Sequence, residues 1–449
     1  MKKKITLNFI LIFLVVLTIF QASMLWLQLP SDNKEEKTTE DEEPKYFRTM
    51  LRPEKAAINF SGYDHTVLYD CKDIYDSYRE LIVETLGRED TKWLISISAE
   101  EYLSLMNESS IVFQFNDNIE GSIFPNLMGL ENINIKEDKQ LKEIYLSNDK
   151  VAISIGEEFY YVDIDGVEGL ESEIASIKNS NYYPYLNFKE LYDINKNIYC
   201  PARNQISAEQ VFYTSDIDNM DDVYRQNLVE RFLSMDIDYV NQITQSDETI
   251  YAFGQRYVKF SSDGTIEYMN NEEFSSQTLN LYTSLNNAIN FITSMLGSAE
   301  NLRVVDIEKL DQKENMGYRI FFNYIENNLT VYPNRGDKKN YVEVEVYSNH
   351  IKSFKQIYRK SVENPKTTEE IQSIMNLDRI VSRNIERFIP TSDENSIKNT
   401  LGKIEYISIV YIDDINPTGN TMLLPALRIN YENRELYFSL RSGRFLMER

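Results

Sequence analysis

The sequence predicts an α+β protein: a single N-terminal transmembrane helix, then an extracytoplasmic region of several modules, each a helix plus an antiparallel meander of strands. Three observations predict this class. An apolar run at the N-terminus is long enough to cross a bilayer, an acidic linker follows it, and the remaining chain alternates helical periodicity with groups of short strands. A helix laid over an antiparallel sheet buries the apolar face of that sheet, so we expect the two patterns to recur together.

The anchor is the strongest local signal. Lys2, Lys3 and Lys4 precede an apolar run from Ile5 to Leu29. As a helix, residues 5–27 measure about 35 Å, which spans a bilayer. The run lacks a clean small-x-small cleavage site, so we expect an uncleaved anchor rather than a removed signal peptide. The lysines place the N-terminus in the cytoplasm of a single-pass cell-membrane protein, with the bulk of the chain extracytoplasmic.

Polar residues interrupt this anchor at Asn8, Thr18, Gln21 and Ser23. They are either polarity that a single span tolerates or hydrogen-bonding groups that pair with another membrane helix. We take Asn8, Thr18 and Gln21 as candidate partner contacts.

Composition shifts divide the chain into five predicted parts, the first of which contains this anchor. They are the cytoplasmic tip and anchor at 1–30, a solvated acidic linker at 31–50, an N-terminal α+β domain at 51–200, a central α+β domain at 201–365 and a C-terminal helix-meander module at 366–449.

The N-terminal domain is expected to open on two short strands and a helix. Strands at Ala56–Phe60 and His65–Tyr69 surround a turn, and apolar spacing predicts a helix over Asp73–Leu86. Ser98 and Glu101 form a capping-box pattern that begins a second helix. Further strands are predicted at Ser110–Phe115, Glu143–Leu146, Val151–Ile155 and Phe159–Ile164.

The C-terminal half contains a unit that occurs twice. Each copy begins with a predicted helix, Leu279–Leu296 or Ile371–Phe388. Strands follow near Val304–Leu310, Tyr318–Tyr324, Leu329–Tyr332, Tyr341–Tyr347 and Ile351–Tyr358, and then near Ile404–Tyr411, Ala426–Tyr431, Glu435–Leu440 and Phe445–Met447. Arg319–Tyr324 resembles Arg428–Tyr431, and Glu-Asn follows each soon after; coincidence of short polar turns is the alternative. The unit resembles small modules of the PepSY and cystatin type.

A partial copy precedes the first full unit, at 206–275. A helix is expected over Val223–Phe232, and strands at Thr249–Phe260 and Thr265–Met269 are joined through an Asp263-Gly264 turn.

Composition and motif searches exclude several functions. The chain has 449 residues, 71 of them acidic and 47 basic, a net charge of −24, and its sequence contains no basic patch for nucleic acid. It contains no Gly-x-Ser-x-Gly, His-Glu-x-x-His, P-loop or Gly-x-Gly-x-x-Gly motif. We therefore expect no enzymatic activity, no catalytic or cofactor-binding residues, and no metal site.

A few residues have side chains that could take part in catalysis, a disulfide or metal binding. His65 and Cys71 lack an orienting third group for a thiolate–imidazolium pair. Cys71 and Cys200 are either one disulfide or two free thiols. The acidic pairs Glu100-Glu101, Glu343 with Glu345, and Asp413-Asp414 could serve as acid and base or as calcium ligands, but a solvated sheet face is favoured for Glu343 and Glu345.

An aromatic stretch provides the best candidate contact surface outside the membrane. Tyr182, Tyr183 and Tyr185 lie within Tyr182–Phe188. They either anchor an interface or fill a seam between domains.

Several segments together resemble the YycH family, regulators of the WalK/WalR two-component system in Gram-positive bacteria. They are the single anchor at Lys2–Leu29, the opening Leu51-Arg52-Pro53-Glu54-Lys55, the stretch Phe260–Arg359, and Leu424-Pro425-Ala426-Leu427-Arg428-Ile429, which is similar to the closing module of the companion protein YycI. The resemblance covers essentially the whole chain through structural motifs.

This resemblance implies a membrane protein that associates with a YycI-like protein and modulates a sensor histidine kinase controlling cell-wall metabolism. Contacts would be made by the transmembrane helix and by the exterior modules. The competing interpretation is an anchored extracytoplasmic binding module or PepSY-type peptidase inhibitor with no kinase partner.

Overall fold

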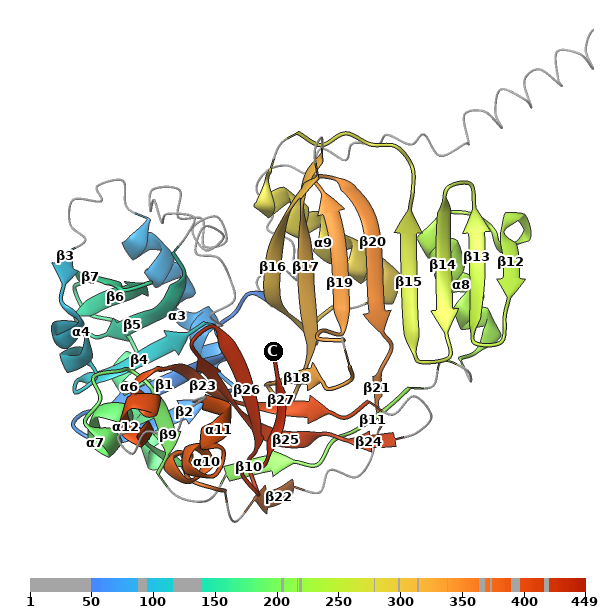
Figure 1. Cartoon of the computed structure of the whole chain (residues 1–449). Coiled ribbons are helices and arrows are strands. Elements are labelled where there is room, and N and C mark those ends of the chain that lie inside the picture. The colour runs from blue at the N-terminus through green and yellow to red at the C-terminus, as the bar shows by residue number, and fades with distance from the viewer. Residues whose placement is uncertain are drawn as a thin grey trace, which may run out of the picture. The chain divides into compact units, whose positions relative to one another are not determined.

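Figure 1 shows the computed structural model of the chain. The structure describes residues 50–87, 95–115, 139–202, 206–215, 217, 220–277, 279–297, 299–312, 315–336, 338–362, 368–371, 374–388, 396–415 and 420–449. All of them belong to one compact unit, Lys45–Arg449. The predicted anchor and linker lie outside this set, and none of the helices within it has the length and apolar character to cross a membrane. The α+β class is confirmed for these residues.

The first half of the described chain forms a nine-stranded sheet in the order β3-β7-β6-β5-β4-β1-β2-β8-β9. Each pair of neighbours in it is antiparallel. The strands are β1 (Lys55–Phe60), β2 (His65–Leu68), β3 (Ile95–Ile97), β4 (Ser109–Gln114), β5 (Leu141–Ser147), β6 (Lys150–Ile155), β7 (Glu158–Asp163), β8 (Pro184–Asn187) and β9 (Tyr199–Pro201).

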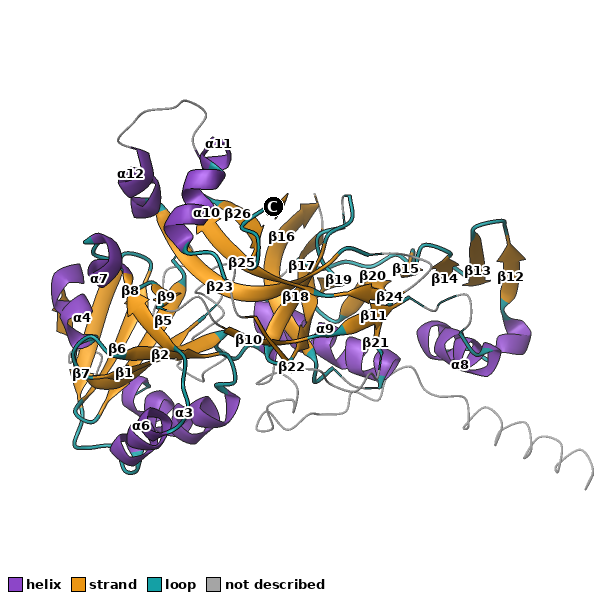
Figure 2. Ribbon diagram, turned by 90° about the horizontal axis from the view of Figure 1, so that it is seen from below, coloured by secondary structure: helices purple, strands orange, loops and turns teal. Residues whose placement is uncertain are grey.

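Helices cover both faces of this sheet (Figure 2). Helices α3 (Lys72–Leu86) and α6 (Leu170–Asn179) pack on the face that presents Ala56 and Ile58 of β1, whereas α4 (Ala99–Leu105) packs on the face of Ala57. Strand β1 is therefore buried along its whole length, because successive side chains point to opposite faces. A short helix, α7 (Phe188–Tyr192), follows β8.

The predicted capping box begins α4 as expected. The Ser98 hydroxyl accepts a hydrogen bond from the backbone N–H of Glu101 at 3.2 Å, and the Glu101 carboxylate accepts one from the backbone N–H of Ser98 at 2.8 Å. Two otherwise unpaired donors of the first turn are satisfied in this way.

The second half forms a thirteen-stranded sheet in the order β12-β13-β14-β15-β20-β19-β17-β18-β23-β25-β26-β27, with β16 also paired to β17. The strands are β12 (Asn241–Thr244), β13 (Glu248–Phe253), β14 (Arg256–Ser261), β15 (Thr265–Asn270), β16 (Leu302–Gln312), β17 (Asn315–Glu326), β18 (Leu329–Pro333), β19 (Val342–Tyr347), β20 (His350–Ile357), β23 (Ile404–Asp413), β25 (Leu424–Tyr431), β26 (Arg434–Ser439) and β27 (Phe445–Glu448). Two small sheets pair β10 (Ile206–Glu209) with β22 (Thr368–Ile371), and β11 (Phe212–Thr214) with β21 (Lys360–Ser361) and β24 (Asn420–Met422).

Helices cover one face of this sheet as well. Helix α8 (Asp222–Leu233) is followed by a 3-10 turn, η2 (Ile237–Tyr239), and α9 (Leu281–Leu296) packs against β17, β19 and β20. Asn280 caps α9, and Gly297 ends it at φ +81°, a left-handed conformation that glycine adopts without steric cost.

The predicted repeat is visible in the turns. In the first copy β17 turns into β18 at Asn327 and Asn328, with φ of 48° and 64°, and in the second β25 turns into β26 at Glu432 and Asn433, with φ of 48° and 63°. Two consecutive positive φ values define a type I′ turn, which suits the twist of an antiparallel hairpin. The Glu-Asn similarity thus corresponds to one shared turn type, although its residues are shifted by one along the turn.

The two copies differ in the strand after this turn. In the second, β26 pairs with β25 throughout, whereas in the first β18 pairs with only two residues of β17, and β19 occupies the rest. Strand β18 instead runs parallel to β23, Val331–Pro333 beside Tyr411–Asp413. This parallel pairing joins the two repeats into one sheet.

Two of the secondary-structure predictions are partly wrong. The helix expected over Ile371–Phe388 is replaced by strand β22, which ends at Ile371, and by two short helices, α10 (Leu377–Arg383) and α11 (Ile385–Phe388). Asn376 is extended with ψ 151°, so helical spacing before it did not produce a helix. A third helix, α12 (Ser396–Gly402), precedes β23.

The strand expected over Thr249–Phe260 is two strands, β13 and β14. They meet at a tight turn in which Gly254 has φ +59°. The following hairpin through Asp263-Gly264, which joins β14 to β15, is confirmed.

Candidate functional site

The three tyrosines proposed as a contact surface lie at and beside β8, near one edge of the nine-stranded sheet. Tyr185 is buried at 5% exposure, so its ring is not available to a partner in this conformation. Tyr182 and Tyr183 are half-buried, and the Tyr182 hydroxyl donates to Asp64 at 2.8 Å. Asn8, Thr18 and Gln21 lie outside the described residues.

The histidine and the two cysteines considered above for catalysis or a disulfide are buried inside the fold. His65 is fully buried, and its ring nitrogens lie 2.8 Å from Asn59 Oδ1 and 2.9 Å from Glu190 Oε1. Cys71 Sγ lies 3.8 Å from the Pro53 carbonyl, not at a histidine. Cys71 and Cys200 are both free and buried, and burial raises the pKa of their thiols to about 11 and about 12.

Of the acidic pairs, Glu343 and Glu345 are bound rather than simply solvated. Both contact Arg319, with Arg319 Nε 3.1 Å from Glu343 Oε1. Glu101 belongs to the capping box described above, and Asp414 accepts a hydrogen bond from the Asn334 amide at 2.6 Å. Among the residues that the structure describes, no group of three or more His, Cys, Asp or Glu side chains is placed to hold a metal ion.

A cluster of buried charges joins the start of β1 to the C-terminal repeat, and we call it the seam cluster: Glu54, Lys55, Tyr332, Tyr406 and Arg428. Arg428 Nη2 donates to Glu54 Oε2 at 2.9 Å, although the two residues are 374 positions apart. Their side chains are 0% and 2% exposed. Arg428 also donates to the Tyr332 hydroxyl at 2.5 Å, and the Tyr406 hydroxyl donates to Glu54 at 3.2 Å.

Nearby positive charges favour the ionised form of the Glu54 carboxyl in the seam cluster. Burial works to raise the pKa of this carboxyl, but Arg428, Arg303 and Lys55 together hold it below its usual value. A buried carboxylate without such partners would take up a proton. Glu54 therefore stays ionised only when the start of β1 contacts the C-terminal repeat, because Arg428 belongs to that repeat.

Lys55 is the third buried charge of this cluster. Its ammonium donates to the backbone carbonyl of Ile407 on β23 and lies 4.3 Å from the centre of the Tyr406 ring. Burial lowers the pKa of Lys55 to about 8, an effect that Glu54 partly opposes. The strand that follows the predicted linker is thus fixed to β23 and β25 by side chains at two successive positions.

A second buried ion pair fixes β20 and its extension to the end of β23. Arg359 Nε donates to Asp413 Oδ2 at 2.9 Å and Arg359 Nη2 donates to Asp413 Oδ1 at 3.0 Å, with both side chains fully buried. The Tyr341 hydroxyl donates to Asp413 at 2.8 Å. Asp413 therefore accepts three hydrogen bonds from within the fold, which satisfy a carboxylate that is fully buried.

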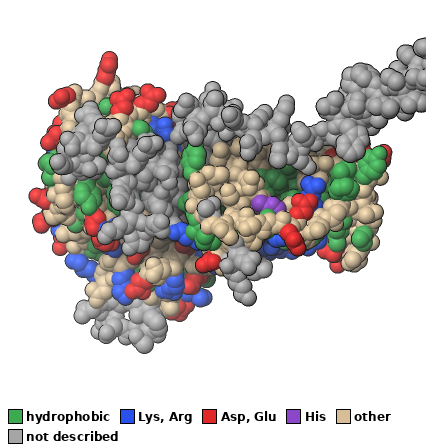
Figure 3. Space-filling model, turned by 90° about the horizontal axis from the view of Figure 1, so that it is seen from above, with side chains coloured by type: hydrophobic (Ala, Val, Ile, Leu, Met, Phe, Trp, Pro, Cys, Tyr) green, Lys and Arg blue, Asp and Glu red, His purple; other side chains and the backbone are tan. Residues whose placement is uncertain are grey.

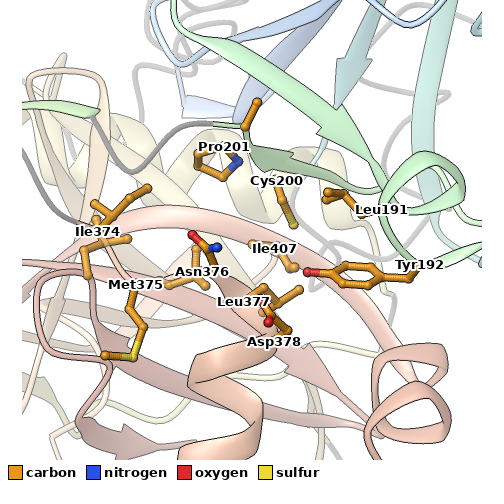
Figure 4. Close-up of a pocket in the computed structure, with 13 residues that line it drawn as sticks. Leu191, Tyr192, Cys200, Pro201, Ile374, Met375, Asn376, Leu377, Asp378 and Ile407 are labelled. Carbon is orange, nitrogen blue, oxygen red and sulfur yellow. The ribbon is translucent and has the colours of Figure 1, made fainter.

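A cavity of about 240 Å³ opens between α7, β9 and the C-terminal repeat (Figure 4). Ile407, Leu427 and Leu440 form part of its wall, and Cys200 directs its sulfur into it. Asn376 and Asp378, from the cap and first turn of α10, contribute polar groups. Sequence patterns gave no sign of this cavity, because its walls come from segments more than 170 positions apart.

Charged side chains of both signs are interspersed on the face shown in Figure 3. On the same face the figure shows a hollow with hydrophobic side chains beside a histidine. His350 is half-buried. Its ring stacks on Phe274 with centroids 4.2 Å apart.

Comparisons with known proteins identify the fold. No protein-family model and no curated protein matches the sequence. The structure is similar to the crystal structure of YycH from Bacillus subtilis, at 12% identity and a TM-score of 0.52, covering 89% of this chain and 98% of that one. Weaker likenesses are an uncharacterized protein from Eubacterium rectale (10% identity, TM-score 0.38, 56% and 90% covered) and the Bacillus megaterium YpeB C-terminal domain (11%, 0.29, 51% and 96%).

The described residues thus define an α+β protein with a YycH-like fold. Two segments on which the sequence resemblance depends meet in this fold: Glu54 and Lys55 belong to the opening Leu51–Lys55, and Arg428 belongs to Leu424–Ile429. A third, ending at Arg359, supplies the other buried ion pair.

Proposed function

We propose that this chain is a membrane-anchored extracytoplasmic regulator of a WalK-like sensor histidine kinase, not an enzyme, and that it acts with a YycI-like partner on cell-wall metabolism. The observation that carries the proposal is the YycH-like fold, which extends over 89% of the chain. The N-terminal apolar run and the three preceding lysines support the anchor.

The mechanism that we propose is differential binding. A regulator shifts a kinase between two states only if it contacts those states unequally. The anchor helix contributes one contact through Asn8, Thr18 and Gln21, and the exterior modules contribute the other. The seam cluster gives a physical route between them, because Glu54 and Lys55 follow the linker directly and are held by buried partners on β23 and β25.

The test exchanges residues 5–27 for a poly-leucine span and measures the phosphorylated response regulator in cells. We expect kinase output to change because the polar contacts are lost, while the amount of protein in the membrane stays the same. A narrower variant replaces only Asn8, Thr18 and Gln21 by leucine, and Ser23→Leu is the matched control. Wild-type output from both exchanged proteins would contradict the membrane contact.

A second measurement separates this proposal from an anchored binding or inhibitor module. Tagged full-length protein is purified from its own membranes, and its companions are identified. We expect a histidine kinase and a second single-pass protein. An exterior released from its anchor that keeps full activity, with no kinase recovered, would contradict kinase regulation.

A further inference from the structure

The cavity beside α10 has the composition of a binding site for a small molecule. Its volume is about 240 Å³. A cavity of about 150 Å³ in another protein accommodates benzene, so by proportion this one accommodates about ten non-hydrogen atoms. Ile407, Leu427 and Leu440 are each at most 5% exposed and present hydrocarbon to it.

Polar groups line part of the cavity, among them Asn376 and Asp378 at the start of α10. Asn376 and Ala202 are exposed and mark the opening, and Asp378 is half-buried beside them. Figure 4 shows the Tyr192 hydroxyl and the Cys200 sulfur pointing into the space between these residues and the apolar wall. A ligand that fills the cavity would therefore be apolar along its body and polar at one end.

The charge at that end is set by Asp378. Among the described residues, no lysine, arginine or histidine forms an ion pair with this carboxylate. Asp378 lines the cavity, and its charge contributes to raising the pKa values of both Cys200 and Tyr192, after the larger effect of burial. The net charge of −24 also raises the local concentration of cations and lowers that of anions.

Lys55 is a buried cation close enough to Cys200 to lower the pKa of its thiol, against the larger effect of burial. Its ammonium donates to the Ile407 carbonyl, and Glu54, whose hydrogen-bonded partner is Arg428, partly offsets its charge. A bound cation would therefore place its charge at the Asp378 end, away from Lys55, and its hydrocarbon toward Leu427 and Leu440.

We propose that this cavity binds a small amphipathic cation, an organic ammonium with a short hydrocarbon body, whose charge pairs with Asp378. The bound molecule would contact β9 and α7 of the nine-stranded sheet together with α10, β23 and β25 of the C-terminal repeat. Binding would favour the arrangement in which these two parts are in contact. The proposal is independent of the kinase partner.

The test uses the two cysteines of the full chain in lipid nanodiscs. Cys200 lines the cavity and Cys71 does not, and both are buried with pKa values raised by burial, so Cys71 is an internal control. Both thiols are labelled slowly with methyl methanethiosulfonate, and mass spectrometry follows each one separately. The probes are hexylammonium, hexanol and heptanoate, which share a hexyl chain and differ in charge.

We expect hexylammonium to protect Cys200 with a Kd on the order of a millimolar. At about ten times that Kd the labelling rate of Cys200 should fall about tenfold, with Cys71 unchanged. Ala202→Trp, at the exposed opening, should slow Cys200 labelling without any ligand.

Asp378→Asn should remove the preference for the cation over hexanol. Asp222→Asn, which changes the same residue type in the first turn of α8 away from the cavity, should behave as wild type. Equal protection by all three probes, a preference for hexylammonium over hexanol that survives Asp378→Asn, or no protection of Cys200 by hexylammonium would each overturn the proposal.

Discussion

Replacement of Arg428 by methionine tests whether the seam cluster holds the first strand to the last repeat. Methionine keeps the length and the apolar part of the side chain but leaves Glu54 without its main partner. At 2.9 Å between Arg428 Nη2 and Glu54 Oε2, an effective dielectric constant of about 20 gives an attraction of about 6 kcal/mol. Desolvation offsets part of this attraction, and breaking a buried pair typically costs about 3–5 kcal/mol of unfolding free energy.

The assay is urea denaturation of the full chain followed by far-UV circular dichroism, with hydrogen exchange of the β1, β23 and β25 amides. Arg428→Met should lower the unfolding free energy by about 3–5 kcal/mol and raise exchange first in these strands. Arg434→Met is the matched control, since Arg434 is 36% exposed and its pair with Glu448 is worth at most about 1 kcal/mol.

A double variant, Glu54→Leu with Arg428→Met, replaces the pair by hydrocarbon. It should be more stable than Arg428→Met alone, because the Glu54 carboxylate is then no longer buried without its arginine partner. Equal unfolding free energies for Arg428→Met and Arg434→Met would refute the reasoning, because the buried ion pair of the seam cluster would then not contribute to stability.

Three further predictions concern single positions. The Lys55 pKa of about 8 in the folded chain is below its value in the unfolded chain, so the unfolded chain binds more protons above pH 8 and stability rises with pH. Relative to Lys55→Met, the unfolding free energy of the wild type should rise by about 2 kcal/mol between pH 7 and 9.5. Urea denaturation at each pH measures this difference. Glu432→Asn should stabilise by about 0.5–1 kcal/mol in thermal melts, because asparagine tolerates the left-handed conformation at φ 48° and already occupies the matching turn position, Asn327, in the first repeat; a loss of stability would contradict this. Gly317→Ala should destabilise by about 1–3 kcal/mol, since an added Cβ would lie 2.5 Å from the Val346 carbonyl oxygen, and an unchanged melting temperature would contradict that packing.

Local patterns predicted the elements that local forces determine. The capping box at Ser98, the amphipathic helix ending at Gly297 and the alternating strand Val342–Tyr347 were all predicted, because each follows from contacts between residues close in sequence. The helix expected from Ile371 was wrong because Ile374 is buried by tertiary contacts while its segment is not helical. Apolar spacing alone does not distinguish these two origins of burial.

The seam cluster could not be paired from the sequence. Arg428 did give a signal, since an arginine inside the apolar strand Leu424–Tyr431 requires a buried partner. Seventy-one carboxylates were available for that role, and nothing local selects Glu54. The parallel pairing of β18 with β23 was missed for the same reason, because it depends on a strand leaving its own hairpin.

The separation of 374 positions between Glu54 and Arg428 has a consequence for how the chain matures. At about 5–20 residues per second, the ribosome makes Arg428 about 20–75 seconds after Glu54. Throughout that interval the Glu54 carboxylate lacks Arg428, its hydrogen-bonded partner, and must remain hydrated. The nine-stranded sheet can assemble early, but its closure onto the C-terminal repeat waits until Arg428 has been made, and the open chain is exposed to proteolysis until then.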